Sequence, residues 1–145
     1  MGDSTTASID RLFTRFVKSS DTFRVYSEGK LIFRSKKEQL KPLLEYIEEF
    51  STQARSVVIF DRIVGNAAAL LLKKASCREI YSPLGSEIAA RTLKEQGIKY
   101  HFSKTVPYIV NKAADDICPM EKLSLGKSPE EFFQHLCRLL GKQQK

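Results

Sequence analysis

The chain has 145 residues, of which 42% are hydrophobic and 28% charged, and this composition suits one globular domain with its own core. No apolar run approaches the ~20 residues of a transmembrane helix, and the N-terminus lacks the apolar segment of a secretory signal, so we expect a cytoplasmic protein. The net charge of +7 allows an anionic partner, but Lys and Arg are spread along the chain, which disfavours a nucleic-acid-binding surface.

The first part of the chain is predicted to hold a disordered segment followed by a helix. Residues 1–8 are small and polar and are expected to be disordered, which leaves 9–145 as a single domain. Residues 9–17 place their apolar side chains at helical spacing, with Ser8 as the N-cap.

A β-hairpin and a second helix are expected next. Residues 23–26 and 31–33 alternate in the manner of strands on either side of Gly29, which favours a tight turn. The helix that follows is apolar on one face as far as Phe50. We expect it to begin at Pro42, because a proline inside the helix would cost ~3 kcal/mol.

Strands and helices then alternate. Residues 57–60 form an apolar run typical of a buried strand, and a helix follows Gly65. Residues 80–81 belong to another short strand. Ser86 is the expected cap of a further helix, which Gly97 ends.

The last part of the chain is predicted to hold a strand, an ambiguous segment and a helix. Residues 98–102 alternate as a strand, whereas 107–111 fit a strand or a helix equally well. Ser128, Pro129 and Glu131 together form a capping box at the start of the final helix. This order of elements favours a mixed sheet covered by helices.

The junction after the apolar run at 57–60 is the first candidate site. In open α/β sheets, ligands bind at the carboxyl ends of strands. Gly65 and Asn66 would begin a helix whose free N–H groups attract an anion. Arg62 could hold a phosphate or carboxylate, and Asp61 could accept from a hydroxyl or amine. The alternative is an ordinary turn in which Gly65 only ends one element and starts the next.

A second candidate site surrounds Cys118. Pro119 suits the first position of a short helix, so Cys118 would be its N-cap and the helix dipole would stabilise a thiolate. Asp116 and Glu121 oppose that effect through their charge, but one of them could carry a proton for a cysteine nucleophile. The alternative is a structural cysteine before an ordinary proline-started helix. No zinc spacing, Walker loop or dinucleotide motif occurs, so no metal or cofactor is expected.

Two segments together resemble a known family. DRIVGNAAALL at 61–71 and DICPME at 116–121 are similar to the signatures of small prokaryotic proteins that form domain-of-unknown-function family 1893. The resemblance extends over about residues 23–126. It implies a cytidine-deaminase-like α/β fold, a three-layer α-β-α sandwich with a mixed sheet.

The resemblance to true deaminases stops at the metal. A zinc deaminase needs a His or Cys two residues before a Glu, and then a P-C-x-x-C pair. Neither pattern occurs here, and the Cys118 motif supplies only one thiol. Many relatives carry Lys at the position of Asn66, so a lysine-dependent role does not transfer to this chain.

Three functions follow from these patterns. The first is a zinc-free domain that binds a small anionic or nucleotide-like ligand. The alternative is a non-enzymatic module for nucleic acid or a protein partner, and the third is a cysteine-dependent enzyme; a homo-oligomer stays open for each. The predicted ligand-binding residues are Asp61, Arg62, Gly65, Asn66 and Asp116, and the predicted catalytic residues are Cys118 and Glu121.

Overall fold

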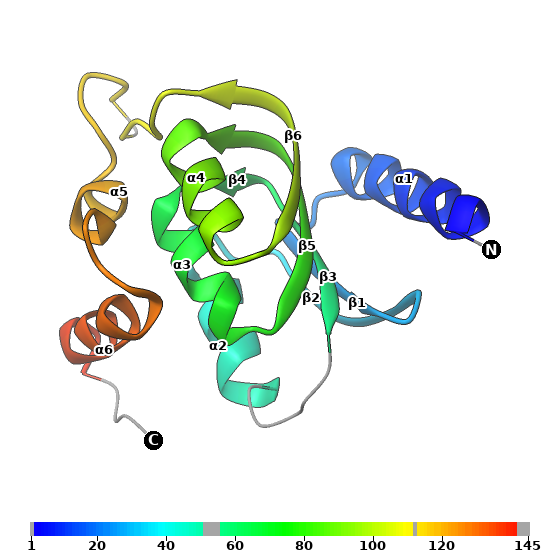
Figure 1. Ribbon diagram of the computed structural model, residues 1–145, viewed down its shortest axis with the longest axis horizontal. Coiled ribbons are helices and arrows are strands. Elements are labelled where there is room, and N and C mark those ends of the chain that lie inside the picture. The colour runs from blue at the N-terminus through cyan, green and yellow to red at the C-terminus, as the bar shows by residue number, and fades with distance from the viewer. Residues whose placement is uncertain (1, 51–55, 112, 142–145) are drawn as a thin grey trace.

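The computed structural model describes residues 2–50, 56–111 and 113–141, without the side chains of 2–8 (Figure 1). No helix in these ranges is both long and apolar enough to cross a membrane. The elements follow in the order α1 (Gly2–Lys18), β1 (Phe23–Ser27), β2 (Lys30–Ser35), α2 (Lys41–Phe50), β3 (Val57–Asp61), β4 (Ile63–Val64), α3 (Asn66–Lys74), β5 (Cys77–Ser86), α4 (Glu87–Glu95), β6 (Lys99–Val106), α5 (Pro119–Ser124) and α6 (Pro129–Leu139).

The strands form one six-stranded mixed sheet. Strand β1 is antiparallel to both β2 and β3, whereas β3, β4 and β6 all run parallel to β5. Strands β4 and β6 both pair with Leu84 and Gly85, so they lie on opposite edges of β5. The short β4 therefore continues the line of β3 along one edge, and β6 takes the other edge.

Helices cover both faces of the sheet, which confirms the predicted three-layer arrangement (Figure 1). Helix α1 packs on one face, where Phe16 meets Val58 and Phe60 of β3. Helices α2, α3 and α4 cover the other face, and α5 and α6 lie outside α3.

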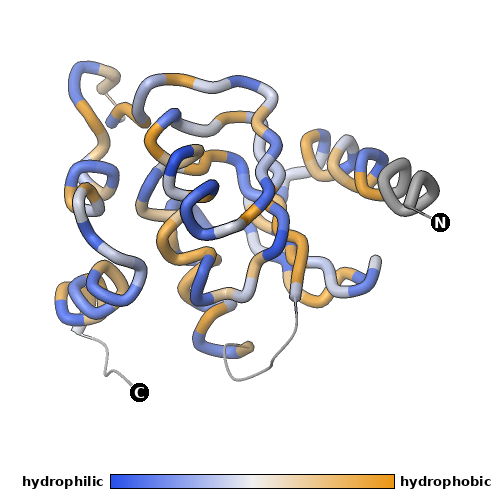
Figure 2. Tube along the Cα trace, in the orientation of Figure 1, coloured by the Kyte–Doolittle hydropathy of each residue, from blue (hydrophilic) through white to orange (hydrophobic). Residues whose placement is uncertain are grey.

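Helix α3 is buried from all sides, because it has the sheet on one side and α5 and α6 on the other. Seven of its nine residues, from Asn66 to Leu72, are buried. Figure 2 shows hydrophobic residues along this helix, and they belong to the main core cluster. An α-helix that is apolar all round needs such a position, and this explains the run of three alanines and three leucines.

Several local predictions are confirmed. Glu28 and Gly29 both have positive φ angles, 51° and 80°, which makes the hairpin turn tight and matched to the twist of its strands. The Ser86 side chain accepts a hydrogen bond from the N–H of Ala89 at the start of α4. Ser128 and Glu131 form the predicted capping box of α6. Each of these signals depends on residues close together in sequence.

Other elements differ from the prediction. Helix α1 begins at Gly2 rather than after Ser8. Strand β5 has ten residues and continues past Pro83, because its pairing with β6 resumes at Leu84. Residues 107–111 form neither a strand nor a helix; within them Val110 makes one isolated bridge with Ile117.

Candidate functional site

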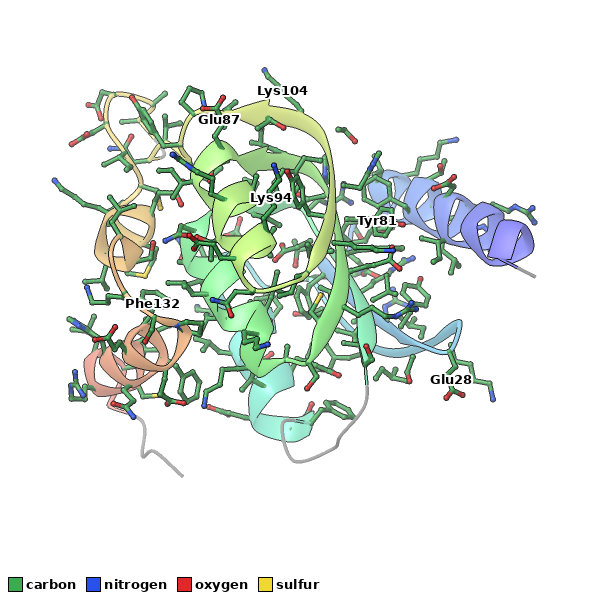
Figure 3. All side chains as sticks on the ribbon, in the orientation of Figure 1. Glu28, Tyr81, Glu87, Lys94, Lys104 and Phe132 are labelled. Atoms are coloured by element: carbon green, nitrogen blue, oxygen red, sulfur yellow. The ribbon has the colours of Figure 1, made fainter. Side chains whose placement is uncertain are left out.

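The carboxyl ends of the parallel strands lie together at one end of the sheet, and α3 and α4 begin there. Figure 3 labels Glu87 and Lys104 at this end, on the first turn of α4 and near the end of β6. The chain after β6 crosses back over the edge to Gly65, where Ile109 Cγ1 lies 3.0 Å from the position of a Cβ atom on the glycine. Such a Cβ would also lie 2.8 Å from Glu121 Oε1, so a side chain at residue 65 would require these neighbouring side chains to shift.

Asp61 is the last residue of β3, and its side chain is buried, with the residue 9% exposed. Burial raises the pKa of Asp61 to about 8, against the opposing effect of hydrogen bonds from the backbone of Arg62 and Ile63. No Lys or Arg of the described chain forms an ion pair with this carboxyl group. Burial therefore favours the neutral form of Asp61.

Arg62 points to the other face of the sheet. Its guanidinium donates to the backbone carbonyls at the end of α1 and just beyond, and its Cζ lies 4.6 Å from the centre of the Phe16 ring. The four acceptors are the carbonyl oxygens of Phe16 (2.8 Å), Val17 (2.9 Å), Ser19 (2.6 Å) and Asp21 (3.0 Å). Four of its five N–H groups are thus used inside the protein, which leaves it without the free donors that the predicted anion clamp requires.

The amino end of α3 already holds an anion, and that anion is the Glu121 side chain of α5. One carboxylate oxygen of Glu121 accepts from the backbone N–H of Asn66, and the other accepts from the N–H of Ile109 at 2.6 Å. Glu121 is only 1% exposed. The place where the sequence predicts an external anion is therefore filled by a residue 55 positions further along the chain.

The Asn66 side chain joins three helices. Its Nδ2 atom donates to Ser124 Oγ of α5 at 3.0 Å, and its Oδ1 atom accepts from Thr92 of α4. Sequence reasoning missed both partners. Thr92 lies on the apolar stripe of its helix, three residues after Ala89, and this position of a polar residue was the available signal. Ser124 carried no comparable signal.

The structure brings Gly65, Asn66 and Glu121 together, whereas Arg62 turns to the other face of the sheet. Cys118 is half-buried at the N-cap of α5, where its side chain makes no capping hydrogen bond. Asp116 is exposed and accepts from the N–H of Ile117, its own neighbour, at 2.7 Å. The roles predicted for Cys118 and Asp116 stay predictions.

An aromatic platform for nucleic acid is not assembled on one surface. Tyr81 lies on the α1 side of the sheet, as Figure 3 shows, whereas Tyr100 and Phe102 pack against the core on the opposite side. Tyr26 is buried. Among the described residues, no three His, Cys, Asp or Glu side chains are placed to hold a metal ion.

Comparison with known proteins identifies the family of this chain, and the function of that family is described as unknown. Residues 13–139 match the family profile described as a domain of unknown function, DUF1893. The crystal structure of a DUF1893 family protein, TM1506 from Thermotoga maritima, is similar with 28% identity and a TM-score of 0.83, over 92% of this chain and 90% of that chain. No curated protein matches. Neither description mentions a cytidine-deaminase-like fold, so that part of the resemblance stays a prediction. The chain belongs to the DUF1893 family.

Proposed function

We propose that this domain binds a small nucleotide-like ligand at the turn from Asp61 to Asn66. The observation that carries the proposal is the burial of Asp61 at the carboxyl end of a parallel strand, with no ion pair to a Lys or Arg among the described residues. Burying a carboxyl group in this way costs stability. Proteins keep such groups mainly where binding or catalysis needs them, and this edge of an α/β sheet is where ligands bind.

The protonation of Asp61 defines the chemistry of the ligand. A neutral carboxyl group has one O–H donor and one carbonyl acceptor. It is complementary to an amide-like edge, in which an N–H lies beside a C=O, as in a nucleobase. Ile63, two residues further on, is 50% exposed and offers an apolar surface for a flat ring.

A simple anion is a less suitable ligand for this site than the sequence predicts, because the donors expected to bind it already have partners. Glu121 takes the N–H of Asn66, and the donors of Arg62 face the end of α1. These contacts support recognition of a ligand through neutral hydrogen bonds rather than through charge. Of the two ligand classes that the sequence predicts, anionic and nucleotide-like, they favour the second.

The test is a thermal-shift panel of uridine, inosine, adenosine and their monophosphates. A ligand at 100 times its Kd stabilises the folded state by about 2.7 kcal/mol, which raises Tm by roughly 5–10 °C. We expect a shift with uridine or inosine for the wild type and for Asp10→Asn, the matched control with an exposed acid on α1. Asp61→Ala should abolish the shift. No shift from any compound with the wild type would reject the proposal.

A further inference from the structure

Strand β6 leaves one edge of the sheet open (Figure 1). Among the described residues, it pairs with β5 alone, in one parallel register from Lys99 to Val106. Along a strand, alternate residues direct their N–H and C=O groups to opposite edges, so part of the backbone of β6 points away from β5. An unpaired row of such groups is a template for another strand.

The two edge strands of the sheet differ in how they are protected from such pairing. Strand β2 has six residues, and its register with β1 shifts between Val25 and Tyr26, which bends and twists that edge. Strand β6 has eight residues, contains no proline and keeps its register with β5. Its protection consists of Lys99 and Lys104, both exposed. A partner strand must therefore avoid placing a cation opposite either lysine.

A second copy of β6 meets this condition. Two identical antiparallel strands in one sheet are related by a two-fold axis perpendicular to the sheet, so directly opposite residues point to the same face. Lys99 and Lys104 are separated by an odd number of positions and point to different faces. Symmetry therefore excludes the register that would set these two lysines against each other.

The register with the axis at Phe102 pairs the strand with itself over most of its length. Three kinds of residue pair then lie opposite each other across the axis: Lys99 with Thr105, Tyr100 with Lys104, and His101 with Ser103. No two lysines meet, the Lys104 ammonium group faces an aromatic ring, and the two Phe102 rings lie side by side.

The neighbouring registers are less suitable. An axis at Ser103 sets Lys99 opposite Pro107, which has no N–H to donate. An axis at His101 sets Thr105 opposite Gly97, which lies outside the strand. The register centred on Phe102 therefore gives the most complete pairing of two copies.

We propose that β6 is an interface between two copies of this chain, which join their sheet edges antiparallel with Phe102 at the two-fold axis. The two sheets then form one continuous sheet. The interface lies on the edge of β5 opposite to β4, so it is separate from the turn from Asp61 to Asn66 and needs no ligand there.

Sedimentation velocity of the full chain at concentrations from about 1 to 200 μM tests the interface. A strand edge is a small contact area, so we expect a weak dimer that forms within this range. The sedimenting species should shift to twice the monomer mass as the concentration rises. A monomer at every concentration would overturn the proposal.

Substitutions at the exposed Thr105 test the register, because this residue faces Lys99 of the other copy and each such pair occurs twice. We expect Thr105→Glu to lower the dimer Kd about fivefold and Thr105→Lys to raise it about fivefold. Combining Lys99→Glu with Thr105→Lys exchanges the charges and should restore the wild-type Kd. The same changes at Thr14, exposed on α1, control for net charge. Equal Kd values for Thr105→Glu and Thr105→Lys would overturn the register.

Disulfide trapping separates this dimer from one formed elsewhere. In the proposed register, His101 of one copy lies opposite Ser103 of the other. A mixture of the His101→Cys and Ser103→Cys proteins should therefore crosslink several times faster than either protein alone, in which the new thiols are about 7 Å apart. All proteins carry Cys118→Ser, because Cys118 is half-buried whereas Cys77 and Cys137 are buried. A dimer in sedimentation without faster crosslinking of the mixture would overturn the proposal.

Discussion

Two aspartates, one between α1 and β1 and one at the end of β3, are both buried and have opposite surroundings. Asp21 is 1% exposed, with Arg24 Nε at 2.7 Å and Arg34 Nε at 3.1 Å. Within the part of the chain that the structure describes, Asp61 forms no ion pair with a Lys or Arg. Burial raises the pKa of both carboxyl groups, but for Asp21 the hydrogen bonds and charges of the two arginines outweigh it, and its pKa falls below the ordinary value.

The difference separates a structural acid from a candidate functional one. The charge of Asp21 is compensated where it lies, so this residue contributes to the docking of α1 and β1. Asp61 accepts backbone hydrogen bonds from Arg62 and Ile63, and these offset only part of the cost of its burial. A buried acid with a compensating partner is weak evidence for function, whereas a buried acid without one at a strand end deserves a binding experiment.

The largest effect is expected from Asp61→Asn, and it depends on pH. The folded-state pKa of about 8 lies above the ordinary 3.8, so the proton favours the folded state. The wild type therefore loses stability as pH rises from about 4 through about 8, at roughly 1.4 kcal/mol per pKa unit. Asn cannot ionise, so Asp61→Asn should be the more stable protein at pH 8 by a few kcal/mol. Urea unfolding at pH 5 and pH 8 measures this; a mutational difference that stays constant with pH would contradict it.

Asp21→Asn should act in the opposite direction. It leaves Arg24 partly buried without its carboxylate, which costs about 3 kcal/mol at pH 7. The pKa of Asp21 is lowered in the folded state, so its contribution is present above the unfolded-state pKa and is lost as pH falls through the folded-state pKa. Urea unfolding at pH 7 and pH 3 checks both statements. A variant as stable as the wild type at pH 7 would remove the contrast between the two aspartates.

The two arginines around Asp21 should differ in importance. The Arg24 side chain is 14% exposed and that of Arg34 is 56% exposed, so water screens the second pair much more. We expect Arg24→Ala to cost about 2 kcal/mol and Arg34→Ala about 0.5 kcal/mol, measured as free energies of unfolding. Equal losses would show that exposure does not decide the strength of these pairs.

The smallest change in the free energy of unfolding is expected from Asp116→Asn. This acid is exposed on the loop before α5 and its carboxylate bonds only to its own neighbour among the described residues. Its substitution should change the free energy of unfolding by less than about 0.5 kcal/mol at either pH. A larger change would indicate that the loop contributes to stability through contacts beyond those of Glu121.

The sequence allowed prediction of those parts of the fold whose causes are local. The capping box from Ser128 to Glu131 spans four residues, and the hairpin turn at Glu28 and Gly29 spans two. Such signals depend on backbone geometry that neighbouring side chains determine. The mixed sheet followed from the order of these elements.

The candidate site was predictable only in part, because its contacts are distant in sequence. The sequence placed Asp61, Gly65 and Asn66 at a strand-to-helix junction, and the structure agrees with that position. It could not show that Glu121 fills the start of α3 or that Arg62 turns toward α1, since these partners lie more than 40 residues away. The direction in which a side chain points at a junction is decided by packing, which periodicity does not describe.

The position of α5 and α6 on α3 has a consequence for the growing chain during synthesis. The sheet side of this helix is complete once β6 has left the ribosome, but the opposite side waits for α5 and α6. A nascent chain that ends near Val106 therefore carries an apolar helix with one bare flank, at the stage when exposed hydrophobic surface invites aggregation. Residues 119–139, which hold α5 and α6, are the part of the chain that covers this flank.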